Sequence, residues 1–180
     1  TLDTPGGGLE ETQIIIKAIE NTTVPVIGYV PASGKAWSAG TLILMGTDIA
    51  AMAPFTVIGS AQPVQMSAEG TKPIEDDKII NALVKFSVET ARKHGRNETF
   101  AEEVITENRN LNDEEALEEG VIEYRASSVP DLLVQVDGET IKGRELHTAN
   151  AEIETYEPPL SLSFLALISN PILSSLLLTI

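Results

Sequence analysis

Apolar residues follow two patterns along the chain, continuous short runs and helical spacing, and the two patterns alternate. Continuous apolar runs of strand length at 24–30 (VPVIGYV) and 48–54 (DIAAMAP) are typical of buried, parallel strands. Helical spacing predicts helices over 9–20, 36–46 and 74–93. Strands that alternate with helices in this way predict an α/β fold with a largely parallel sheet.

The remaining elements are shorter. Asn112 caps a predicted helix, and Glu115 occupies its capping-box position. Residues 55–73 are predicted to be extended or loop-like. Residues 137–157 have a composition typical of short strands and turns. The other predicted elements are helices over 99–106 and 111–120, a strand over 121–126 and a helix that opens at Ser128.

The C-terminal segment, residues 158–180, carries no charge. A membrane-spanning helix needs about 20 apolar residues, and Pro171 divides this segment. We therefore expect a short interfacial or docking helix over 160–170. Pro171 would occupy the first turn of a transmembrane helix. The alternative is a buried C-terminal helix.

Charge and composition exclude several classes of function. The sequence holds 27 Asp and Glu against 12 Lys and Arg, which disfavours nucleic acid as a partner. It has no cysteine, so it offers no disulfide, thiol nucleophile or thiolate metal site. No histidine or acidic cluster has metal-ligand spacing, and no metal or cofactor is expected.

Ser38 is the first candidate for chemistry. It follows a predicted buried strand and lies at the start of an apolar helix. This places it near the carboxyl end of a sheet strand, where the functional sites of α/β proteins lie. The glycine turn DTPGGG at residues 3–8 would free backbone N–H groups to hold a phosphate or a developing oxyanion. Gly7 and Ala39 are the expected donors. Taken alone, the glycine run is more typical of a tight turn, and Ser38 is more typical of a helix-capping or small packing residue.

A serine nucleophile needs a base, and the chain offers few. Lys78 lies near the start of the predicted 74–93 helix, but a lysine serves as a base only when desolvation lowers its pKa. By itself it is also typical of a surface lysine. His94 and His147 are less suitable, because one ends a helix and the other lies in the strand-and-turn tail. Ser60 is a rival serine that is better placed to line a groove.

An ordered set of motifs resembles the ClpP class of serine peptidases: LDTPGGG, VPVIGYV, AWSAGTLILMG, IAAMAP, TVIGSAQPV and DEEALEEGVIE. It is most similar to the archaeal membrane-bound proteases of the NfeD type, related to signal peptide peptidase A. The resemblance implies a Ser38–Lys78 dyad, with the N–H groups of Gly7 and Ala39 as oxyanion hole. The soluble ClpP members carry a histidine about 25 residues after the serine, and none stands there here.

The resemblance also implies an architecture. Residues 1–157 would form a ClpP/crotonase-like spiral of ββα units that lacks its first strands, and residues 158–180 an apolar interfacial segment and the start of a transmembrane helix. Residues 54–64 would border the substrate groove. The groove residues are expected to be Gly6, Trp37, Gly59 and Ser60.

The function implied is a membrane-anchored serine endopeptidase that cleaves hydrophobic segments of membrane-associated proteins. The resemblance also implies a stomatin-like partner and assembly as a homodimer or higher homo-oligomer. It further implies a location at the cell membrane, with the protease domain extracytoplasmic. A second hypothesis is a catalytically inactive NfeD-type scaffold beside a stomatin-like protein. A third is an acyl-CoA enzyme of the crotonase type, but the sequence shows no clear adenine-nucleotide site or acidic catalysts.

Overall fold

The computed structural model describes residues 1–67, 70–157, 159 and 162, and divides the chain into two units after Asn150. In the second unit, residues 151–157 form neither helix nor strand. No helix among the described residues is both long and apolar enough to span a membrane. The predicted helices over 160–170 and from Pro171 onward lie outside the described residues, except for Leu162.

Two three-stranded sheets form the framework of the first unit. In one, β3 pairs in parallel with both β1 and β8; in the other, β4 pairs in parallel with β2 and antiparallel with β7. The largely parallel α/β arrangement that the sequence predicts is thus confirmed. The strands are β1 (Ile27–Val30), β2 (Lys35–Trp37), β3 (Ile49–Met52), β4 (Val57–Gly59), β7 (Asn110–Asn112) and β8 (Tyr124–Arg125).

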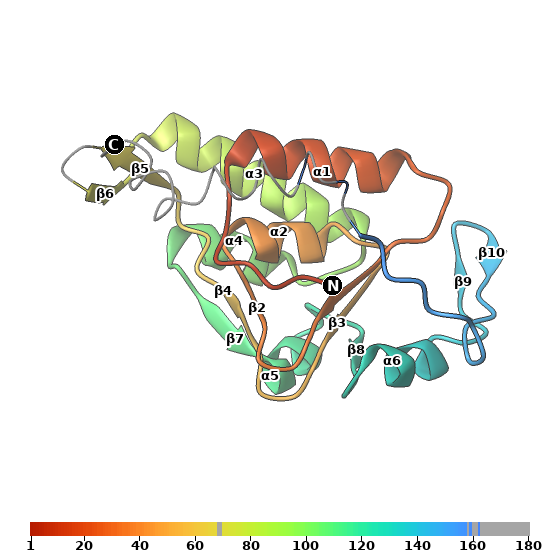
Figure 1. Cartoon of the computed structure of the whole chain (residues 1–180). Coiled ribbons are helices and arrows are strands. Elements are labelled where there is room, and N and C mark those ends of the chain that lie inside the picture. Colours follow the sequence, from red (N-terminus) through yellow and green to blue (C-terminus); the bar gives the residue numbers. More distant parts are fainter. Residues whose placement is uncertain (68–69, 158, 160–161, 163–180) are drawn as a thin grey trace. The chain divides into compact units, whose positions relative to one another are not determined.

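Helices cover these sheets, with α2 between the strands and the helices α1 and α3 (Figure 1). Apolar residues of α2 and of the strands meet in one core cluster, which includes Leu44, Met45 and Met52. The helices are α1 (Leu9–Asn21), α2 (Ala39–Met45), α3 (Asp77–Lys93), α4 (Glu98–Thr106), α5 (Asp113–Glu118) and α6 (Val129–Gln135).

Side-chain caps explain where several helices begin. The Asn112 side chain accepts hydrogen bonds from the first turn of α5 while Glu115 bonds back to the Asn112 N–H, which confirms the predicted capping box. Ser128 caps α6 as expected. Helix α3 begins three residues later than predicted, because Asp76 accepts a hydrogen bond from the Lys78 N–H.

Two predictions about secondary structure were wrong. The helix predicted from residue 36 begins only at Ala39, and residues 35–37 form strand β2 instead, because Ala36 lies between Ile58 of β4 and Thr4. The loop-like segment 64–73 contains an antiparallel hairpin of β5 (Val64–Ser67) and β6 (Gly70–Pro73). Strand β6 is exposed throughout and has no alternation of apolar and polar residues, so the strand pattern was not recognised. The strand-and-turn texture near the end corresponds to a second hairpin, β9 (Thr140–Ile141) and β10 (Arg144–Glu145).

Candidate active site

Ser38 occupies a sharp turn between strand β2 and helix α2. Its backbone has φ 53° and ψ −118°, a conformation that residues other than glycine rarely adopt. The turn is fixed because the Ser38 N–H donates to the Gly59 carbonyl at 2.8 Å and its carbonyl accepts from the Thr41 N–H at 3.0 Å. The fold therefore holds a strained backbone in order to present this serine at the start of a helix.

Thr41 stabilises the same turn from inside the protein. This fully buried residue places its hydroxyl 2.7 Å from the Ala36 carbonyl and 3.0 Å from the Gly59 carbonyl, and accepts the Gly59 N–H at 2.8 Å. One hydroxyl therefore connects the residues on both sides of Ser38 with strand β4. Thr41 was not among the residues that the sequence pattern singled out, although it follows Gly40 in the AWSAGTLILMG motif.

The glycine turn lies directly against Ser38. Thr4 fixes its position by pairing with strand β2, through Thr4 N–H to Lys35 carbonyl (2.8 Å) and Trp37 N–H to Thr4 carbonyl (3.1 Å) bonds. At Gly6, where φ is 133°, a Cβ atom would stand 2.9 Å from the Ser38 Cβ. Only glycine permits both this backbone conformation and this close approach.

The two expected oxyanion donors lie near each other. A Cβ built on Gly7 would be 3.8 Å from the Ala39 Cβ, and both residues border the same cavity as Ser38. Ala39 is the first residue of α2, so its N–H has no acceptor within the helix. A serine oxygen beside two backbone donors is an arrangement that can stabilise the oxyanion of an acyl-transfer reaction.

The cavity beside Ser38 has a volume of about 180 Å³ and is enclosed mainly by aliphatic side chains. Helices α1, α2 and α3 contribute to it, together with residues 61–64, the segment that leads into hairpin β5–β6. Its shape and lining suit an apolar side chain. The apolar residues in contact with it include Leu9, Leu42, Pro63, Val64, Ile79 and Leu83.

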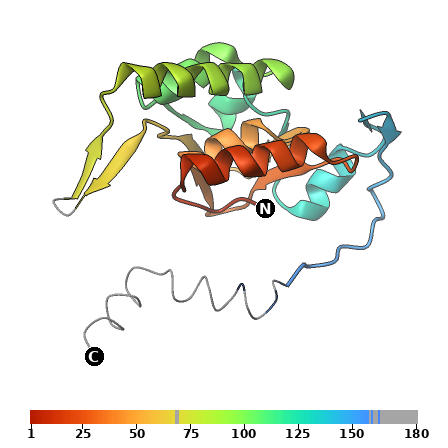
Figure 2. The ribbon, with the colours of Figure 1, turned by 90° about the horizontal axis from the view of Figure 1, so that it is seen from above.

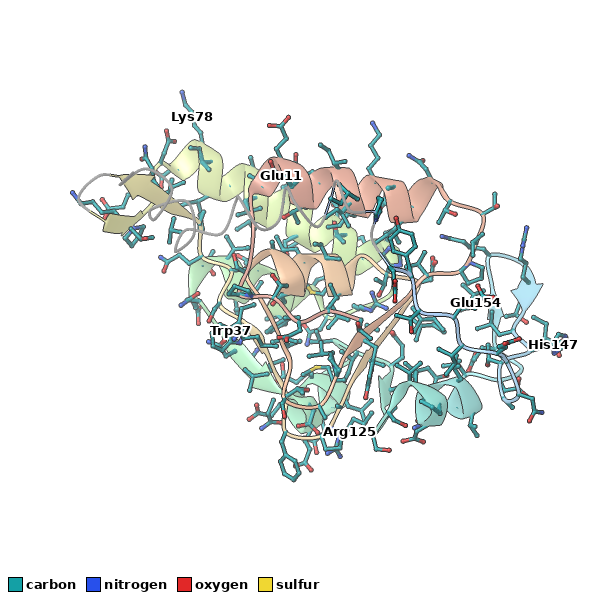
Figure 3. All side chains as sticks on the ribbon, viewed as in Figure 1. Glu11, Trp37, Lys78, Arg125, His147 and Glu154 are labelled. Carbon is teal, nitrogen blue, oxygen red and sulfur yellow. The ribbon has the colours of Figure 1, made fainter. Side chains whose placement is uncertain are left out.

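The predicted groove residues border this site without lining the cavity, whose walls include none of Gly6, Trp37, Gly59 and Ser60. Trp37 is 38% exposed, and the Lys35 Nζ lies 4.9 Å from the centre of its ring. Figure 3 shows Trp37 beside the sheet of β2 and β4. The Ser60 hydroxyl donates to the Asn110 side-chain oxygen at 2.8 Å. Along this segment, the residues that line the cavity begin just after this serine.

Lys78 lies apart from the serine. It is exposed in the first turn of α3, and Figure 3 shows its side chain extending outward from that helix. The next residue, Ile79, faces the cavity instead. The structure thus brings Ser38, Gly7 and Ala39 together, and leaves Lys78 outside this group.

The histidines lie away from the serine. His94 follows α3 at the end opposite to the one that reaches the cavity. Burial lowers the pKa of His94, and the nearby Arg96 cation lowers it further. His147, near hairpin β9–β10, does not line the cavity either (Figure 3). Among the described residues, no three histidine or acidic side chains gather to hold a metal ion.

Comparisons with known proteins agree on one family. Residues 1–147 match the family model described as the NfeD1b N-terminal domain. The chain is 37% identical over 187 residues to the membrane-bound protease PH1510 of Pyrococcus horikoshii, which covers 99% of this chain. It spans 42% of the length of that relative.

Solved structures give the same result. A lysine-to-alanine mutant of the 1510-N membrane-bound stomatin-specific protease, in complex with a substrate peptide, superposes with a TM-score of 0.85 and 37% identity, and covers 93% of this chain and 80% of that one. A serine-to-alanine mutant of the same protease gives 0.81 and 38%, and covers 87% of this chain and 80% of that one.

Proposed function

Because the chain belongs to the NfeD1b N-terminal domain family, we propose that it is a serine endopeptidase with Ser38 as its nucleophile. The observation that carries this proposal is the strained turn at Ser38, pressed against Gly6 and flanked by Gly7 and Ala39. Ser38 Oγ attacks the peptide carbonyl, and the two backbone N–H groups bind the oxyanion. The first unit then acts as a ClpP-like protease domain with a crotonase-like spiral.

Lys78 is the proposed base, which takes the Ser38 proton and passes it to the leaving amine. Ser38 and Lys78 are 40 residues apart, and the serine and lysine replaced in the two solved relatives are 41 apart in their own chain. The exposed Lys78 side chain must turn toward the cavity before it can act as the base for Ser38. Neighbouring helix positions differ by about 100°, so a rotation of the first turn would exchange Lys78 with Ile79.

Hydrophobic segments of membrane-associated proteins are the proposed substrates. The aliphatic cavity beside Ser38 supports this choice, since it would take up an apolar side chain next to the scissile bond. A similar protease is stomatin-specific, so we propose a stomatin-like protein as substrate or partner. We also propose that the protein lies at the cell membrane, anchored through residues 158–180, with its protease domain extracytoplasmic. The domain is further proposed to assemble as a homo-oligomer.

Cleavage of a quenched fluorescent peptide with an apolar core tests the dyad. Ser38→Ala and Lys78→Ala should each lower kcat at least about 10³-fold, because either loss removes the activated nucleophile. Lys85→Ala is the matched control, since Lys85 is an exposed lysine of the same helix whose one ion pair among the described residues is with Glu89. It should keep full activity.

The outcomes separate the hypotheses. Undiminished cleavage by Ser38→Ala would end the serine mechanism, and undiminished cleavage by Lys78→Ala would transfer the role of base to another group. A protein that cleaves nothing, yet binds a stomatin-like peptide equally well with and without Ser38, would be the inactive scaffold.

A further inference from the structure

Arg96 is a buried cation at the far end of the helix that begins at Ser38. The residue is only 4% exposed. Its Nη1 donates to three carbonyl oxygens at the end of α2: those of Leu44 (3.2 Å), Met45 (2.6 Å) and Thr47 (2.8 Å). The last carbonyls of a helix have no N–H donor from a following helical turn, so Arg96 supplies donors at this end, and its positive charge complements the helix dipole. The Leu44 carbonyl also accepts the Thr47 N–H and hydroxyl.

The other side of the guanidinium binds one carboxylate with two bonds. Arg96 Nε and Nη2 donate to Glu123 Oε1 and Oε2 at 2.8 and 2.7 Å. Glu123 Oε2 also accepts the Ala50 N–H of strand β3 at 2.6 Å. Arg96 therefore connects the end of α2 to the central strand of the parallel sheet.

Arg96 also belongs to the turn that ends α3. It follows the last helical residue, Lys93, by three positions, and its own N–H donates to the Ala91 carbonyl at 2.8 Å. The helix that carries Lys78 at its start is thus joined, at its other end, to the helix that carries Ser38. One side chain fixes the relative position of both.

We propose that Arg96 is a positioning residue for the active site, an inference that rests on the serine protease function proposed above. Helix α2 has seven residues, so it is about 10 Å long and moves as one piece. A shift at its Arg96 end would displace Ser38 Oγ and the Ala39 N–H by a similar amount. A misplacement of about 1 Å can cost about 10²-fold in rate.

Arg125 provides a matched control for the stability effect. It also pairs with a buried carboxylate, that of Asp113, and it contacts Glu114 as well. Among the described residues, its side chain donates to Asp113 and Glu114 and to no group of α2, so its loss should weaken the fold without moving the serine. Lysine at either position keeps the charge but cannot reproduce the planar, two-sided contacts of a guanidinium.

The experiment compares Arg96→Lys with Arg125→Lys in the whole chain, well below the melting temperature of each variant. Arg96→Lys should lower kcat for the fluorescent peptide by about 10- to 100-fold with KM changed less than about threefold, because binding groups stay and only alignment is lost. Arg125→Lys should keep kcat within about twofold. An equal loss in both variants, or an unchanged kcat in Arg96→Lys, would overturn the proposal.

Amide hydrogen exchange gives a readout that does not depend on activity. In Arg96→Lys, the amides of residues 42–47 should exchange faster than in the unaltered protein and in Arg125→Lys. Unchanged exchange there would overturn the role of Arg96. If the unaltered protein cleaves no peptide, the protease function fails, while faster exchange confined to α2 would still support the contact.

Discussion

The two sides of the cavity differ in how firmly they are held. On the serine side, the Ser38 N–H, the Thr41 hydroxyl and Gly6 all contact neighbouring backbone or side chains at short distance. On the other side, Lys78 and Ile79 are exposed in the first turn of α3. The exposed hairpin β5–β6, which precedes that turn, extends away from the helices in Figure 2.

This difference separates two tasks of the proposed enzyme. The serine and its oxyanion donors gain from a rigid arrangement, because their value depends on alignment before the substrate arrives. A lysine base needs a dry environment that an exposed side chain lacks. The serine side is held by these contacts in the structure, whereas the open side must change before Lys78 can serve as the proposed base.

Apart from the proposed dyad of Ser38 and Lys78, the largest effect is expected from a substitution on the rigid side. Gly6→Ala would place a Cβ 2.9 Å from the Ser38 Cβ at a φ of 133°, so the turn and the serine must separate. We expect kcat/KM to fall by about 10²-fold or more in the peptide assay. Gly138→Ala is the control, because φ is 85° there but an added Cβ would meet no described residue within 4 Å apart from its chain neighbours. Equal losses in both variants would refute the role of the contact between Gly6 and Ser38.

A smaller loss is expected from Thr41→Val. The change removes the hydroxyl that bonds Ala36 and Gly59 and leaves the buried Gly59 N–H without an acceptor. Unfolding by denaturant should show about 1–3 kcal/mol of lost stability, and kcat should fall about tenfold. Thr41→Ser should restore both. Thr56→Val, which removes another buried hydroxyl, should lower stability alone.

Apart from Lys78, the smallest effect is expected on the open side. Ile79→Ala removes part of the apolar wall without touching the serine turn. KM should rise about three- to tenfold while kcat stays the same, since only apolar contact with the substrate is lost. Ile14→Ala, an exposed position of α1, is the control. A kcat loss as large as that of Thr41→Val would show that the open side also aligns the reacting groups.

The sequence predicted those elements whose signals are local. Helix α1, the capping box at Asn112 and the Ser128 cap follow from residues within a few positions of one another. Strand β2 was misassigned because its pairing partners, Thr4 and Ile58, lie far away in the sequence. The same reason explains why Arg96 was missed, since it contacts a carbonyl 52 residues before it.

By itself, the sequence determined the alternation of the two buried strands with helices, the serine between those strands, the glycine turn and the absence of a cysteine nucleophile. Only the tertiary structure decided that Gly6 lies directly against Ser38 and that Thr41 and Arg96 fix the two ends of α2. It also decided that the Lys78 side chain extends away from the helix into solvent. Periodicity and caps are properties of neighbouring residues. Distances between the glycine turn, α2 and α3 depend on how whole elements pack, which no local pattern records.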